Sequence, residues 1–291
     1  MAWVNAIIQG ILIGGLYALF ACGLSLMFGV MKVVNLAHGD LAVMAGYIGV
    51  GVIAVTHVPV LWSIPIVVIL MAVIGYILQR SIIQGAISRG ELTTLIVTFG
   101  LSIIIENALQ QFFTANSRGI GVGESFITAS FSIGSQIVIP WLYVVIFVLA
   151  VVVLLGLQQY LSRSRYGRLI RAVADDQEAA QLSGANYRHV FGIAAAIAFG
   201  TVAVAGMFEG MITTISPTLG TDTILLFAFA SVVIGGLGSL WGTLLGGVIL
   251  GVAQAVGAQI NPSWEQLAGY AVFLLVLVIR PQGLVGQGAT S

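Results

Sequence analysis

Charged residues are scarce in this sequence. Asp, Glu, Lys and Arg together make up 7% of its 291 residues, whereas a soluble globular domain carries about 25% of them. The single cysteine excludes a scaffold stapled by internal disulfides. The ten basic residues form no stripe of the kind that nucleic-acid-binding proteins carry. A protein with so little charge cannot cover its surface in water, so soluble enzymes and nucleic-acid binders are excluded.

Long apolar runs take the place of charge. Hydrophobic residues make up 59% of the chain, its mean hydropathy is +1.10, and residues 1–31, 41–79, 125–162 and 223–264 contain no Asp, Glu, Lys or Arg. An α-helix needs about 20 mostly apolar residues to cross a bilayer. The sequence therefore predicts an all-α, polytopic transmembrane helical bundle, formed as a single domain over residues 1–291, with about 8–10 membrane segments. The expected spans are residues 4–28, 33–55, 60–79, 92–113, 138–160, 190–212, 222–236, 240–258 and 265–280.

The basic residues indicate how the bundle is oriented. With these spans, nine of the ten Lys and Arg residues fall on one side of the membrane, and only Arg118 falls on the other. Loops rich in Lys and Arg stay in the cytoplasm. We therefore expect a multi-pass protein with its amino terminus outside and its carboxyl terminus inside.

The most polar stretch is the loop 161–189 on the basic side. Within it, Asp175 and Glu178 have the spacing of a capping box, and Gly184 suits the position just past a helix end. These signals predict a short helix over about 175–183. A helix of two turns does not persist alone in water, so we interpret it as a docking helix for a cytoplasmic subunit. The alternative is a solvated loop that only sets the topology.

A second polar group comes at the start of the second span. It contains Asn35, His38, Gly39 and Asp40. An Asp at the centre of a membrane helix costs about 2.5–3.5 kcal/mol, so these side chains are expected to face protein or a watery cavity on the substrate path. The alternative is a helix start in which Asn35 and Asp40 cap free backbone amides. No further residues with suitable spacing make this group a metal site.

A cluster of glycines ends the seventh expected span, which is short enough to be a half-helix. The cluster comprises Gly235, Gly236 and Gly238, followed by Ser239. Two glycine-broken segments in the two halves of a chain are typical of inverted-repeat transporters, and here they would be 35–49 and 235–247. Tight packing of small residues is the alternative.

One more carboxylate, Glu106, lies within the fourth span. A carboxylate inside a membrane segment is a candidate functional group. Glu106 is expected to meet the ammonium group of a zwitterionic substrate or to pair with another subunit. The alternative is a side chain that reaches out to the membrane surface.

Four of these segments, in this order, resemble one family. They are Asn35 to Asp40, Arg171 to Asn186, Gly235 to Ser239, and Arg280 to Leu284. Over almost its whole length the chain resembles the permeases of branched-chain amino acid ABC transporters, specifically the H-type permease of the leucine, isoleucine and valine system. The resemblance implies a location in the bacterial cytoplasmic membrane.

The resemblance also implies partners and site residues. Such a permease pairs with a related M-type permease, two cytoplasmic ATPases and a periplasmic substrate-binding protein, and ATP and Mg²⁺ bind the ATPases rather than this chain. The ATPase-docking residues would be Arg171, Asp175, Asp176, Glu178, Leu182, Gly184 and Asn186. The polar and glycine-rich segments themselves, rather than the resemblance, predict that the substrate path includes Asn35, His38, Gly39, Asp40, Glu106, Gly235, Gly236, Gly238 and Ser239.

Three other functions remain as alternatives. Relatives of similar sequence transport urea and short amides. An ion-gradient-driven secondary transporter would share the apolar spans and would work as a single chain. An intramembrane enzyme would need a nucleophile and a base, or a metal cluster, that face each other, but His38, His57 and His189 are scattered along the chain. We therefore expect a transport subunit and no enzymatic activity.

Overall fold

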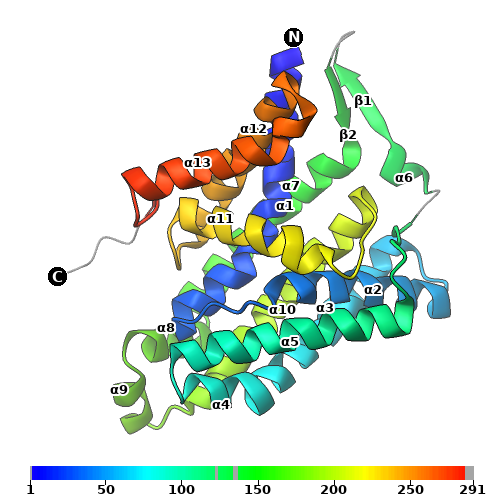
Figure 1. The fold of residues 1–291 in the computed structure, drawn as a ribbon. Coiled ribbons are helices and arrows are strands. Elements are labelled where there is room, and N and C mark those ends of the chain that lie inside the picture. Colours follow the sequence, from blue (N-terminus) through cyan, green and yellow to red (C-terminus); the bar gives the residue numbers. More distant parts are fainter. Residues whose placement is uncertain (1, 122–123, 134–136, 286–291) are drawn as a thin grey trace.

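The computed structural model describes residues 2–121, 124–133 and 137–285. Within these residues the fold is a bundle of long helices (Figure 1), and eight of them are long and apolar enough to cross a membrane. The long helices are α1 (Ala2–Met31), α2 (His38–Thr56), α3 (Val60–Leu78), α5 (Glu91–Phe113), α7 (Trp141–Arg163), α10 (Tyr187–Ile212), α12 (Leu240–Ile260) and α13 (Glu265–Ile279). The predicted all-α, multi-pass membrane bundle is confirmed.

Two of the spans are longer than their main helix. α3 continues through a π-helical turn, η1 (Gln79–Ile83), into α4 (Gln84–Ile87), and α13 is preceded by a 3-10 turn, η3 (Pro262–Trp264). The seventh segment is shorter than the others: η2 (Gly220–Ile224) leads into α11 (Leu225–Gly235). This segment covers Gly220–Gly235 only, as the half-helix prediction required.

Short elements mark the two ends of the bundle (Figure 1). α6 (Ser125–Thr128) and an antiparallel hairpin of β1 (Ser130–Ile133) and β2 (Ile137–Pro140) lie at one end. α8 (Arg165–Asp175) and α9 (Gln177–Leu182) lie at the other, which we call the α8–α9 end. The fifth span therefore starts at Trp141 instead of residue 138, because the residues before it pair in the hairpin.

The two most buried spans form the centre of the bundle. These are α1 and α10, which pack against each other. α1 also packs along α12, and α10 packs along α3. Likewise, α1 contacts the half-helix α11 and α10 contacts α2. The first helix of each half of the chain thus lies against the second and third helices of the other half. The inverted repeat itself stays a prediction.

Small residues let the central helices approach closely. A Cβ atom added to Gly14 of α1 would lie 2.6 Å from the Cα of Val248 on α12, and one added to Gly247 would lie 2.8 Å from the backbone nitrogen of Ala18. Contacts between small residues of this kind drive the association of membrane helices, because lipid provides no hydrophobic force to do so.

The last residues of the described chain cap the C-terminal end of the half-helix α11. The backbone N–H of Leu284 donates to the carbonyl of Ile234 at 2.9 Å, and that of Val285 donates to Gly235 at 3.0 Å. The last carbonyls of a helix have no partner within the helix itself. The closing Arg280 to Leu284 segment therefore supplies the C-terminal cap of α11.

Gly283 makes this cap possible, which gives a first prediction. Its φ is +79°, and an added Cβ would lie 2.8 Å from the Val233 carbonyl oxygen. A left-handed conformation costs an L-residue about 1–2 kcal/mol. Gly184 has a similar φ of +86° with open space around it, so Gly184→Val is the matched control. We expect Gly283→Val to lower the melting temperature of the purified protein further than Gly184→Val does; equal losses would show that the contact with α11 contributes nothing.

Candidate substrate path and docking segment

The chain re-enters the bundle between α1 and α2. It turns at Lys32, whose φ is +57°, and residues 33–37 are not helical. The Asn35 side-chain oxygen accepts from the N–H of Ala37 at 3.1 Å, and the N–H of Leu36 donates to Thr98 Oγ1 of α5 at 3.2 Å. Irregular backbone at membrane depth is tolerated only where protein satisfies its polar groups, and this segment meets that condition.

A second non-helical segment, residues 213–218, leads toward η2, and the helix starts that follow the two segments meet. An added Cβ on Gly39 would lie 2.7 Å from the carbonyl carbon of Gly220, and one on Gly220 would lie 2.6 Å from the Cα of Asp40. The first turns of α2 and η2 therefore cross in backbone contact. The crossing lies beside Ser102, at the middle of the 23-residue helix α5, and so halfway along a helix long enough to span the membrane.

Asp40 lies at this crossing and is fully buried. Ser102 Oγ donates to its Oδ2, and Thr221 Oγ1 lies 3.1 Å from each carboxylate oxygen. The partners of this carboxylate in the structure are thus neutral hydroxyl groups. Its position in the first turn of α2 favours negative charge, since the unpaired N–H groups of a helix start carry partial positive charge. Among the described residues no cationic side chain pairs with Asp40, so the crossing holds an anionic group without a counter-charge.

Asn35 and His38 hold the re-entrant segment in place. His38 is fully buried, and its Nε2 lies 2.8 Å from the carbonyl oxygen of Phe20 on α1. The Asn35 Nδ2 atom lies 3.9 Å from the Met27 sulfur. Four residues near the start of α2 were predicted to line the substrate path. Asp40 lies at the crossing, and Gly39 lets the two backbones meet there. The side chains of Asn35 and His38 contact α1 instead.

Glu106 lies on the same face of α5 as Ser102. Its Oε1 accepts from Gln110 Nε2 at 3.0 Å. The polar residues of this face follow one another at intervals of four, which places them on one side of a helix; they are Thr94, Thr98, Ser102, Glu106 and Gln110. Sequence reasoning missed Thr98, Ser102 and Thr221. Thr98 and Ser102 could have been found from the sequence, because polar residues recur there every four positions in an otherwise apolar helix.

The glycine cluster lies elsewhere. Gly235, Gly236 and Gly238 form the turn between α11 and α12, where Gly238 contacts Gly29 near the end of α1. Ser239 Oγ accepts from the N–H of Gly242 at 3.1 Å and so caps α12. The expected pairing of 35–49 with 235–247 is therefore wrong. α11 separates the glycine turn from the crossing, and the residues that meet Asp40 from this half of the chain are Gly220 and Thr221.

The basic loop contains two helices, where the sequence predicted one. Asp176 is extended (φ −148°) and ends α8. Its Oδ1 accepts from the N–H groups of Glu178 and Ala179, both at 2.9 Å, so Asp176 caps α9. The predicted cap at Asp175 is wrong by one residue, because Asp175 still belongs to α8. Gly184 follows the end of α9 with φ +86°, as expected.

The short helix α9 presents an apolar side chain outward. Leu182 is 91% exposed at the end of α9, and Asn186 then caps α10 by accepting from the N–H of His189 at 3.2 Å. Behind α9 lies an open hollow of about 440 Å³ between it, α8 and the start of α10, with Leu169 and Ala172 in its wall. The docking role predicted for this segment would place Leu182 and the apolar hollow against a partner.

The bundle, its half-helix and its buried carboxylate at the meeting of two helix starts define a polytopic membrane transport protein. Residues 6–278 match the family described as the permease component of branched-chain amino acid transport systems. The chain belongs to this family. Its permeases are components of ATP-binding-cassette systems, which implies separate ATPase and binding-protein components.

Relatives of known name agree with this placement. The chain is 29% identical to the high-affinity branched-chain amino acid transport system permease protein BraD of Pseudomonas aeruginosa, over 98% of this chain and 96% of that protein. It is 27% identical to the corresponding protein LivH of Escherichia coli, with the same coverage. It is also 24% identical to the ribose import permease protein RbsC of Escherichia coli, over 90% of this chain and 81% of that protein. No solved structure matches the chain.

Proposed function

We propose that this chain is the membrane subunit of an importer that moves branched-chain amino acids into the cytoplasm. The observation that carries the proposal is the family match over residues 6–278. The crossing at Asp40 fits the substrate class, because a buried carboxylate bonded only to hydroxyls is suited to bind an α-ammonium group.

The basic residues orient the chain in the cytoplasmic membrane. The α8–α9 end carries most of the Arg residues of the loops, so it faces the cytoplasm. The amino terminus is then outside, and the described chain ends inside. A second, related permease completes the membrane part, and a periplasmic binding protein delivers the amino acid.

The chain draws its energy from elsewhere. Its sequence contains no Gly-Lys-Ser/Thr phosphate loop, so two ATPase subunits bind ATP and Mg²⁺ beneath the α8–α9 end. Closure of the ATPases tilts the helix bundles as rigid bodies and switches the path between outward and inward openings. Such a cycle drives uptake only if ATP binds one of the two states more tightly.

Reconstitution tests this function. The chain is co-expressed with its genomic neighbours, purified and placed in proteoliposomes with the ATPase sites accessible to ATP. We expect ATP-dependent uptake of leucine, isoleucine and valine, and none of urea, acetamide or ribose. Uphill uptake by this chain alone without ATP would refute the proposal in favour of a secondary transporter. Uptake of only urea or amides would refute the substrate class.

The docking role of α9 gives a second prediction. Leu182→Asp places a charge on the exposed apolar end of the segment, so we expect at least a tenfold loss of the ATPases that co-purify with the chain. The fold is expected to be unaffected, because the residue makes few contacts. Leu92→Asp is the matched control: Leu92 is 71% exposed at the start of α5, which is outside the docking segment. Equal recovery of the ATPases with both variants would show that they dock elsewhere.

A further inference from the structure

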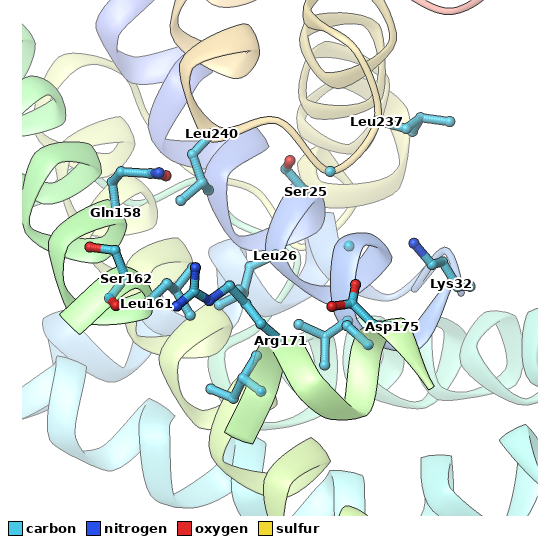
Figure 2. Close-up of a pocket in the computed structure, with 15 residues that line it drawn as sticks. Ser25, Leu26, Lys32, Gln158, Leu161, Ser162, Arg171, Asp175, Leu237 and Leu240 are labelled. Carbon is cyan, nitrogen blue, oxygen red and sulfur yellow. Dashed lines mark hydrogen bonds between the residues drawn. The ribbon is translucent and has the colours of Figure 1, made fainter. Parts of the chain in front are cut away.

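A cavity separate from the Asp40 crossing lies at the α8–α9 end. Its volume is about 260 Å³, below the roughly 300–1,000 Å³ of sites for drug-sized ligands. Four parts of the fold enclose it: the ends of α1 and α7, helix α8, and the glycine turn between α11 and α12. Figure 2 shows residues from all four parts around one space. A small molecule bound there would touch the bundle and the docking segment together.

Charges of both signs line this cavity. Arg171 and Asp175 lie one turn apart on α8, and Lys32 follows the end of α1 (Figure 2). Arg171 donates to the backbone oxygen of Ser162 at 3.1 Å, which fixes its position and leaves most of its five N–H donors free. Among the described residues, no ion pair joins Asp175 to either basic side chain. All three charged side chains are exposed, and Asp175 lies between the two basic ones in Figure 2. A ligand would therefore meet charges of both signs on the exposed side of the cavity.

A buried hydroxyl points to a ligand independently of these charges. Ser25 lines the cavity, is 1% exposed, and its Oγ has no hydrogen-bond partner among the described residues. A buried polar group without a partner costs about 1–3 kcal/mol. A polar ligand atom in the cavity would supply the missing bond. Leu26, one residue further along α1, and Leu240, at the start of α12, give the same cavity an apolar wall.

We propose that this cavity binds a zwitterionic aliphatic amino acid from the cytoplasmic side. Arg171 would bind its carboxylate, Asp175 and the Ser25 hydroxyl would bind its ammonium group, and Leu26 with its apolar neighbours would contact the side chain. The identity of the ligand rests on the proposed function, since it is the transported class of molecule. The placement of the charges rests on the structure alone.

Occupancy of this cavity has a mechanical consequence. The ligand would tie α8 to the glycine turn, and α8 leads directly into the docking helix α9. An amino acid that has accumulated inside would therefore hold the docking segment against the bundle. Binding at this cavity connects the internal concentration of the product to the part of the chain that meets the ATPases.

Equilibrium binding to the purified permease complex tests the site. The probes are radiolabelled leucine, 4-methylpentanoate, which lacks the ammonium group, and 3-methylbutylamine, which lacks the carboxylate. We expect leucine to bind at least tenfold more tightly than either analogue. Arg171→Gln and Asp175→Asn are each expected to weaken leucine binding at least tenfold, and Ser25→Ala by a smaller factor. Arg168→Gln is the matched control, since Arg168 lies on α8 and binds the Arg163 carbonyl outside the cavity.

The outcomes separate this site from the proposed function. Wild-type leucine affinity in both the Arg171 and Asp175 variants, or equal affinity for leucine and its analogues, would overturn the cavity proposal even if ATP-driven uptake is intact. Loss of binding in those variants but not in Arg168→Gln supports the site. The same loss in a complex that shows no ATP-driven uptake of any amino acid would leave the site standing and refute the transport function.

Discussion

Replacing Gly39 with valine is expected to remove most of the folded protein from the membrane fraction. Gly39 lies where α2 and η2 cross, and a Cβ there would lie 2.7 Å from the carbonyl carbon of Gly220 and 2.9 Å from the N–H nitrogen of Leu225. These neighbours are backbone atoms, which cannot rotate away as a flexible side chain can. Overpacking typically costs 1–3 kcal/mol, and a collision between two backbones is expected to exceed about 3 kcal/mol.

The same helix provides the control. Gly51 also lies in α2, but a Cβ added there meets nothing within 4 Å. Gly51→Val thus introduces the same residue into the same helix without the crossing. Folded yield is measured by size-exclusion chromatography of a fluorescent fusion in detergent. If Gly39→Val and Gly51→Val give similar yields, the close crossing of the two helix starts is not required for folding.

The spans could be read from the sequence because hydropathy is a local property. In a run of apolar residues long enough to cross a bilayer, the backbone N–H and C=O groups must bond to one another. The run therefore forms a helix whatever its neighbours are. The expected ranges 4–28, 92–113 and 190–212 therefore fall on α1, α5 and α10. Glycine and Asp signals likewise placed the half-helix and the short helix before Gly184, although the cap came one residue later, at Asp176.

The partners of Asp40 could not be read in this way. Ser102 and Thr221 lie 62 and 181 residues further along the chain, and only the packing of α5 and η2 brings them together. The expected match between the two glycine-rich breaks failed for the same reason. Glycine marks where a chain can turn, but which turns meet depends on how the helices pack. Gly220 did not stand out from the other glycines, and its contact with Gly39 is a property of the fold.

The functional meaning of the crossing is tested by Asp40→Asn. This change removes the charge and keeps the shape, and the amide can still bond the hydroxyls of Ser102 and Thr221. Hydrogen bonds to a charged group are worth about 1.5–3 kcal/mol, so loss of the charge is expected to reduce ATP-driven uptake of leucine about tenfold to a hundredfold. Stability is expected to stay the same or rise, because a buried charge without an opposite charge opposes folding.

Opposite effects on uptake and stability distinguish a substrate-binding charge from a structural one. If the charge of Asp40 only strengthened the bonds that join α2 to α5 and η2, Asp40→Asn would lower both the melting temperature and uptake. If the charge instead binds substrate, Asp40→Asn lowers uptake and leaves the melting temperature unchanged or higher. Asp40→Glu keeps the charge and is expected to retain much more uptake than Asp40→Asn. Glu209→Gln is the control for removing a half-buried acid elsewhere in the bundle, where its carboxylate accepts from Thr213 Oγ1 at 3.0 Å. Wild-type uptake in Asp40→Asn would exclude this carboxylate from the substrate path.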